Sequence, residues 1–107
     1  MLRISVVKKS GAVHLKLEGK LAHEWVQEAH ETWKALAQMT EEKPIVVDLR
    51  NVSFVDDPGH ELLVSMRHAG AELVGYGPMI SALVEEIERT EIAAATAVGS
   101  EEGKNMK

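Results

Sequence analysis

Residues 45–63, which read IVVDLRNVSFVDDPGHELL, contain the signals that decide the fold. The first five residues are apolar except for Asp48, and such a run is typical of a central strand covered on both faces. Val52 and Phe54 are expected to continue this strand with their side chains pointing inward. Pro58 suits the first turn of a helix, because the N–H that proline lacks has no partner there. The stretch therefore predicts a strand, a sharp corner and a helix.

The upstream residues predict a hairpin and a first helix. Residues 2–7 are mostly β-branched and apolar, and residues 8–11 (KKSG) suit a turn. In residues 12–18 apolar and polar side chains alternate, which indicates a half-buried strand. Residues 22–39 form a helical pattern, since the apolar side chains recur at steps of three and four. These side chains are Val26, Ala29, Trp33, Leu36 and Ala37.

The downstream residues predict a second helix, a short strand and a third helix. The second helix is expected to end near residues 69–70 and to bury Leu62, Leu63 and Met66. Residues 72–75 suit a strand, and a third helix follows Gly77-Pro78. Residues 90–98 either extend this helix or form another, and residues 99–107 are expected to be a frayed tail. The apolar face predicted for the third helix comprises Ile80, Leu83, Val84 and Ile87.

The predicted element order is β-β-α-β-α-β-α. This order indicates an α/β fold with one small mixed β-sheet and helices packed against it. We expect a single domain over residues 1–98 and a flexible tail over residues 99–107, which agrees with a length of 107 residues.

Composition and charge exclude several classes of function. The net charge of −5 argues against nucleic acid as a partner, because phosphate binding needs clustered Lys and Arg. The sequence has no cysteine, so disulfides, thiolate metal sites and cysteine nucleophiles are excluded. No apolar run approaches the roughly 20 residues of a membrane span. A cytoplasmic protein without direct membrane insertion is expected.

Three motifs in order resemble the STAS domain family. Residues 17–21 (LEGKL) match its hydrophobic-Glu-Gly-x-Leu motif, and residues 69–73 (AGAEL) match its entry into the last strand. Between them, residues 48–63 are similar to Asp-hydrophobic-x-x-Val, then hydrophobic-Asp-Ser-Ser-Gly, then a helix with Leu-Leu. The resemblance covers roughly residues 1–87. It implies the small α/β fold of anti-sigma factor antagonists and of the cytoplasmic tails of sulfate transporters.

One departure from this family pattern concerns regulation. In the phospho-regulated antagonists, the second serine of the Asp-Ser-Ser-Gly motif accepts phosphate from a partner kinase. That position is Pro58 here, and the first serine is Asp57. The resemblance therefore implies a chain that cannot be phosphorylated at the family position. Asp57 would supply a fixed negative charge at a helix N-terminus, where anions are favoured.

The corner around Asp56 and Asp57 allows other interpretations. It is also an ordinary helix start, because Asp at the N-cap and Pro at the first helical position are expected there. Catalysis by two adjacent surface carboxylates is disfavoured, because acid–base pairs need separated pKa values within a pocket. A metal site on His23 and His30 is disfavoured as well, because two helical turns separate them. No cofactor is predicted, and the chain is expected not to be an enzyme.

The function that we expect is binding of a protein partner. In the antagonist branch the partner would be an anti-sigma factor with a serine-kinase fold. The alternatives are an assembly subunit of a lipid-transport ABC complex and a nucleotide or small-ligand sensing module, and a homodimer is left open. The residues expected to contact the partner are Asp56, Asp57, Pro58, Gly59, His60, Glu61, Val64, Arg67 and His68.

Overall fold

The computed structural model describes residues 1–39 and 43–90. Its elements are β1 (Leu2–Lys9), β2 (Ala12–Leu21), α1 (Glu24–Met39), β3 (Ile45–Val55), α2 (Asp57–His68) and β4 (Glu72–Val74). A third helix begins at residue 78 and continues through residue 90, the last that the structure describes. The predicted order of elements is confirmed. The proposed domain boundary at residue 98 and the tail over residues 99–107 lie outside the described residues.

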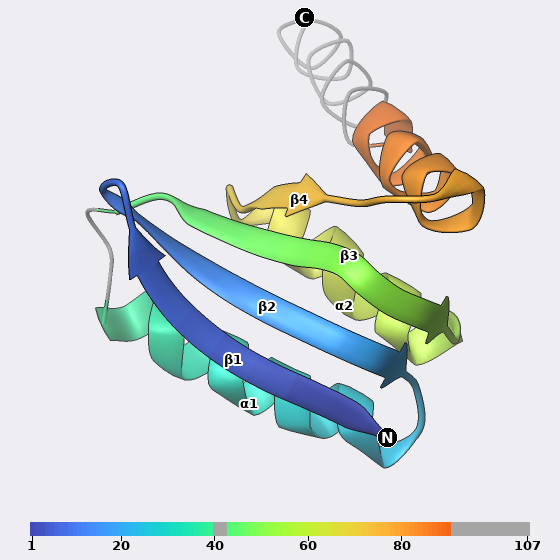
Figure 1. Ribbon diagram of the computed structural model, residues 1–107, viewed down its shortest axis with the longest axis horizontal. Helices are drawn as coiled ribbons and strands as arrows, with labels where there is room; N and C mark the ends of the chain where they lie inside the picture. The colour runs from blue at the N-terminus through green and yellow to red at the C-terminus, as the bar shows by residue number, and fades with distance from the viewer. Residues whose placement is uncertain (40–42, 91–107) are drawn as a thin grey trace, which may run out of the picture.

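The four strands form one mixed sheet in the order β1-β2-β3-β4. β1 and β2 are antiparallel, whereas β2, β3 and β4 run parallel. Both α1 and α2 lie on the same face of the sheet, as Figure 1 shows. The third helix lies beyond β4 at the end of the sheet. The predicted α/β fold with a small mixed sheet is confirmed.

The core lies between the sheet and its helices. On β2, Val13, Leu15 and Leu17 have no exposed surface, as their alternation predicted. The stripe predicted for α2 is buried as well, and α1 contributes Trp33 and Leu36. Because burying one such apolar side chain contributes about 1.5–3 kcal/mol, this layer supplies most of the driving force for folding.

β3 continues through Val52 and Phe54, as predicted, but contains two irregularities. Between Asp48 and Val55 its pairing with β2 shifts twice, and each shift adds one residue to β3. An added residue changes which face the following side chains occupy. Val52 still points into the core, but Phe54 is 44% exposed. The prediction that Phe54 points inward is therefore wrong, because the second shift places it opposite Lys20 on the other face.

The third helix joins the core through Ile80, Val84 and Ile87. A Cβ atom at Gly75 would lie 2.9 Å from the Ile80 side chain and 3.2 Å from that of Val84. Glycine at this position thus lets the helix approach the end of β4 closely. The prediction that residues 75–78 turn the last strand into the third helix is confirmed.

Candidate functional site

The corner between β3 and α2 lies where two parallel strands end side by side. Leu21 at the end of β2 pairs with Val55 at the end of β3. The connection from β2 to α1 therefore meets the connection from β3 to α2. Ligands of open α/β sheets bind outside the carboxyl ends of their strands, and the predicted site residues begin at this edge with Asp56.

Asp56 holds these two connections together. One carboxylate oxygen accepts a hydrogen bond from the Gly59 N–H at 2.9 Å, which caps α2. The other oxygen accepts one from the His23 N–H, also at 2.9 Å. The Asp56 N–H donates to the Leu21 carbonyl at 3.2 Å. Asp56 is thus a brace between segments 33 residues apart in sequence.

These backbone contacts also fix the charge of Asp56. The N–H groups of His23 and Gly59 hold the pKa of its carboxyl below the ordinary value, because they stabilise the ionised form. An ionised carboxylate with both oxygens engaged is poorly suited to exchange protons with a substrate. Sequence reasoning left the cap open between Asp56 and Asp57, and the structure assigns it to Asp56.

His23 was missed as a member of this corner. Its backbone has a φ of 58°, in the left-handed region that side chains other than Gly and Asn seldom adopt. This conformation ends β2 and precedes the start of α1 at Glu24, two residues later than predicted. The only signal in the sequence was its place between a strand and a helix, and the helical pattern predicted for residues 22–39 included it.

Gly59 is buried because β2 passes close to it. A Cβ atom there would lie 2.5 Å from the Leu21 carbonyl oxygen and 3.1 Å from the Leu21 side chain. Such an approach leaves no room for a side chain, so any other residue would push α2 away from β2. Gly59 therefore shapes the corner but presents no side chain to a partner.

Asp57 and Pro58 project from the corner. Both are exposed, and they form the first two residues of α2. Pro58 has no N–H to donate, and Asp57 places its carboxylate in the first turn, near the positive end of the helix dipole. Asp56 accepts two backbone hydrogen bonds, whereas Asp57 makes no hydrogen bond or ion pair that the structure records.

The remaining predicted contact residues differ in how far they reach the surface. Glu61 and His68 are exposed, whereas His60 and Val64 are half-buried. Arg67 is half-buried, and its guanidinium Nη1 donates to the Ala71 carbonyl at 3.2 Å. Arg67 thus supports the connection to β4, and this contact makes it less available to a partner than Glu61.

A shallow groove adjoins the corner between α1 and α2. It encloses about 230 Å³, and Pro58, Glu61 and Leu62 line its α2 side. Val26, Gln27 and His30 line the opposite side. Sequence reasoning missed this contribution of α1, since nothing local indicates which of its faces lies beside α2.

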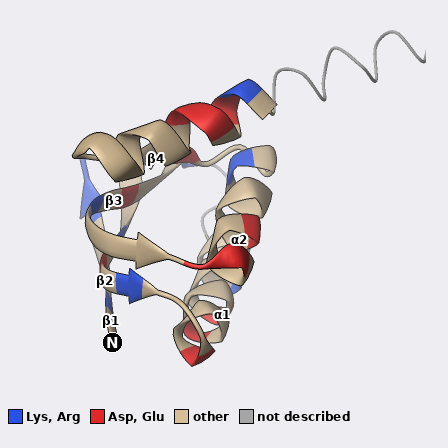
Figure 2. Ribbon diagram, turned by 90° about the vertical axis from the view of Figure 1, so that its right-hand side faces the viewer, with Lys and Arg blue, Asp and Glu red and all other residues tan. Residues whose placement is uncertain are grey.

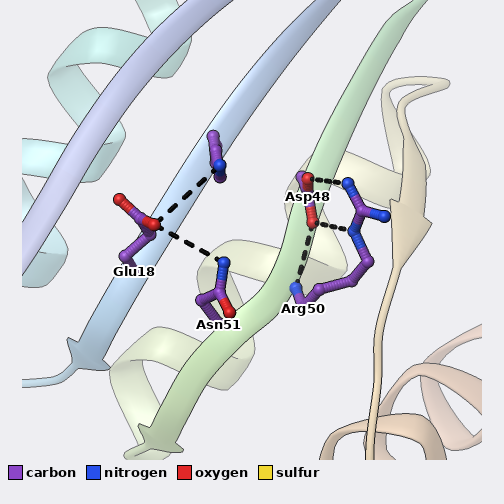
Figure 3. A network of polar contacts seen from close by, with 5 residues as sticks. Glu18, Asp48, Arg50 and Asn51 are labelled. Atoms are coloured by element: carbon purple, nitrogen blue, oxygen red, sulfur yellow. Dashed lines mark hydrogen bonds and ion pairs between the residues drawn. The ribbon is translucent and has the colours of Figure 1, made fainter.

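A second polar cluster lies on the sheet face opposite α1 and α2. Asp48 is only 5% exposed, and Arg50 pairs with it through bonds of 2.8 and 3.0 Å (Figure 3). The side-chain hydrogen bond from Arg50 lowers the pKa of the Asp48 carboxyl. Figure 3 also shows Glu18 between its neighbours on β2 and β3, with Asn51 at 3.5 Å. These contacts join side chains of β2 and β3 to one another.

No metal centre or membrane segment emerges from the described residues. Within residues 1–39 and 43–90, no three His, Cys, Asp or Glu side chains are grouped so that they could hold an ion. None of the helices in these two ranges combines the length and apolar character that crossing a membrane requires.

Comparison of the sequence with protein-family models and with curated proteins finds no match. Comparison of the structure with solved structures finds several that are similar. An anti-sigma factor antagonist from Mycobacterium paratuberculosis superimposes with a TM-score of 0.69 at 17% identity, over 89% of this chain and 82% of that one. The fold is that of the anti-sigma factor antagonists.

Two further structures share this antagonist fold. The anti-sigma factor antagonist SpoIIAA in its unphosphorylated form gives a TM-score of 0.55 at 15% identity, over 75% of this chain and 77% of that one. Mglu gives 0.54 at 20% identity, over 70% of this chain but only 19% of that chain. The antagonist fold thus occurs both as most of a small protein and as part of a larger one.

Proposed function

We propose that this chain is a non-catalytic protein-binding module that docks a partner at the Asp56–Glu61 corner and along the adjacent surface of α2. The observation that carries this proposal is that the two aspartates of the corner have different surroundings. The Asp56 carboxylate accepts backbone hydrogen bonds through both oxygens, whereas Asp57 beside it is exposed. The result is a rigid corner that presents a fixed negative charge.

The partner that best suits this corner is an anti-sigma factor with a serine-kinase fold. The antagonist fold and the motif resemblance support this choice. A regulated antagonist would carry a serine where this chain has Pro58, and phosphorylation would add about −1.5 to −2 charge there. Asp57 supplies a smaller charge that no kinase or phosphatase alters. We infer that binding is constitutive.

The first experiment captures the partner and tests the corner in one step. The immobilised chain is incubated with extract of the source organism, and bound proteins are quantified by mass spectrometry. Asp57→Lys should lose the partner. Glu72→Lys should retain it, because Glu72 is an equally exposed acid at the opposite end of the sheet. Equal recovery on both variants would contradict docking at the corner.

The identity of the captured protein decides between functions. A serine-kinase-fold anti-sigma factor supports the proposal, whereas an ABC-transporter ATPase would replace it with the assembly role. A protein of neither class would overturn the assignment of partner but not the docking surface.

The second experiment tests the fixed charge. The double variant Asp57→Ser/Pro58→Ser restores both serines. We expect it to acquire one phosphoryl group from the kinase-type partner and ATP, and to bind that partner with altered affinity. The wild-type chain should acquire none. Identical affinities for the wild-type chain and the variant, phosphorylated or not, would contradict a role for the built-in charge.

A further inference from the structure

The third helix carries apolar side chains on two faces. Ile80, Val84 and Ile87 point into the core. On the adjacent face, Met79 is 57% exposed, and Leu83 is partly buried and packs against the core. A helix at the surface of a soluble domain normally turns polar residues outward. The packing of this domain therefore covers the apolar stripe of Met79 and Leu83 only in part.

This stripe faces the end of β3 across a hollow. Phe54 and Val55 line one side of the hollow, and Met79, Leu83 and Glu86 belong to the other. Its volume is about 280 Å³. Because an apolar cavity of roughly 150 Å³ accepts benzene, the hollow has room for one or two large apolar side chains.

The hollow adjoins the corner and shares its negative charge. Phe54 and Val55 lead directly into Asp56 and Asp57, and Glu86 lies in the wall of the hollow. Figure 2 shows acidic residues on the third helix and at the start of α2, with the uncharged end of β3 between them. Lys20, opposite Phe54 on β2, is a nearby basic side chain. Of the described residues that line the hollow, only Glu86 is charged, and it is acidic.

We propose that the hollow is the anchor pocket for a basic segment of the protein partner, which inserts one large apolar side chain between Phe54 and the third helix. This inference rests on the proposed function, because it places the pocket on the same docking surface as Asp57. The acidic surroundings favour Lys and Arg beside the anchor. They disfavour a second copy of this chain, which would bring two acidic corners together, and an anionic small ligand.

The test uses defined peptides as probes. Three fluorescent 14-residue helical peptides are compared by polarisation: a Lys/Arg-rich peptide with one central Trp, the same peptide with Ala in place of Trp, and a Glu-rich peptide with Trp. The basic Trp peptide should bind about tenfold or more tightly than either of the others. Equal binding of all three, preference for the acidic peptide, or no binding would overturn the proposal.

Variants then locate the binding. Met79→Gln should weaken the basic Trp peptide about tenfold. Met39→Gln should leave it unchanged, since Met39 is another exposed helical methionine and does not line the hollow. Phe54→Ser, on the opposite wall, gives a second measurement. Thermal melts confirm that each variant is folded. Equal affinity in all three variants and the wild-type chain would place binding elsewhere.

The captured partner separates this inference from the proposed function. If Asp57→Lys abolishes its binding while Met79→Gln and Phe54→Ser do not, the proposed function stands and the anchor pocket is wrong. If none of these substitutions alters its binding, both are wrong. The proposed function and the anchor pocket are both supported if binding is lost with Asp57→Lys and with either pocket variant but is retained with Met39→Gln.

Discussion

Asp48 and Asp56 lie on the same strand–helix unit, and in both the pKa of the carboxyl is lowered, but by different means. Asp48 is held by the guanidinium of Arg50, two residues away, which pairs with it across the sheet face. Asp56 is held by backbone N–H groups of His23 and Gly59. Asp48 is thus held within its own strand, by the side chain and the backbone N–H of Arg50, whereas Asp56 is held by the backbone of two different connections.

Asp48 therefore takes part in a local charge pair, whereas Asp56 helps to build the corner. The contacts between Asp48 and Arg50 stay within β3, because both partners belong to the same strand. Removing Asp56 releases the start of α2 and the β2–α1 connection together. The backbone thus engages the first acid of the corner, whereas the second acid, Asp57, is exposed, and we propose that it contacts the partner.

The largest effect should come from Gly59, which lets the two connections approach. Gly59→Ala forces a Cβ atom against the Leu21 carbonyl. We expect a loss of about 1–3 kcal/mol in the free energy of unfolding, as for overpacked sites, measured by urea denaturation. Ser65→Ala, at an exposed position of the same helix, is the control and should change stability little. An unchanged or stabilised Gly59→Ala variant would show that the corner is not tightly packed.

Asp56→Ala should have the next largest effect. It removes acceptors from the N–H groups of both His23 and Gly59, so we expect the melting temperature to fall by several degrees. Asp56→Ser retains a cap for α2 but is too short to serve both donors, so its melting temperature should lie between those of the wild-type chain and Asp56→Ala. If Asp57→Ala destabilised the chain as much as Asp56→Ala, the distinction between the two acids would fail.

Removing Arg50 and removing Asp48 should lower the melting temperature by different amounts. Arg50→Ala leaves the buried Asp48 carboxylate without its ion pair, whereas Asp48→Ala leaves an arginine that is largely exposed to water. An unpaired buried charge is more costly than an exposed one. We therefore expect Arg50→Ala to lower the melting temperature more than Asp48→Ala does, and both less than Asp56→Ala. The reverse order for the two members of the pair would contradict this account.

The smallest effect should appear in the dependence of stability on pH. Because the pKa of Asp56 is lower in the folded chain than in the unfolded one, its ionised form contributes stability above the unfolded value of about 3.9. This contribution is lost as the pH falls through the lowered pKa. Urea denaturation of Asp56→Asn between pH 5 and about 2.5 should accordingly show a shallower acid loss than the wild-type chain. Parallel curves would indicate that Asp56 titrates normally.

The sequence predicted those features of this unit that depend on local pattern. Alternation in residues 12–18 and the stripe of Leu62, Leu63 and Met66 are properties of neighbouring residues, and the structure confirms both. Pro58 after two acids marked the helix start to within one residue. The order of elements predicted the small mixed sheet, and the structure confirms it.

The features that the sequence did not reveal depend on contacts between distant segments. The two added residues in β3 are defined only by its pairing with β2. For this reason the sequence placed Phe54 on the wrong face of the strand. The role of His23 depends on a backbone N–H that no side-chain pattern reports. The hollow beside Met79 was not predicted either, because its opposite wall, Phe54 and Val55, comes from a distant strand.

The most direct test of the docking corner is an amide NMR titration of the labelled chain with its captured partner. This account predicts that the largest chemical-shift changes fall on Asp57, His60 and Glu61, and extend to Phe54 and Met79 beside the third helix. Changes confined to the strands β1 and β2 around Lys16 and Glu18, with the amide of Asp57 unmoved, would contradict it.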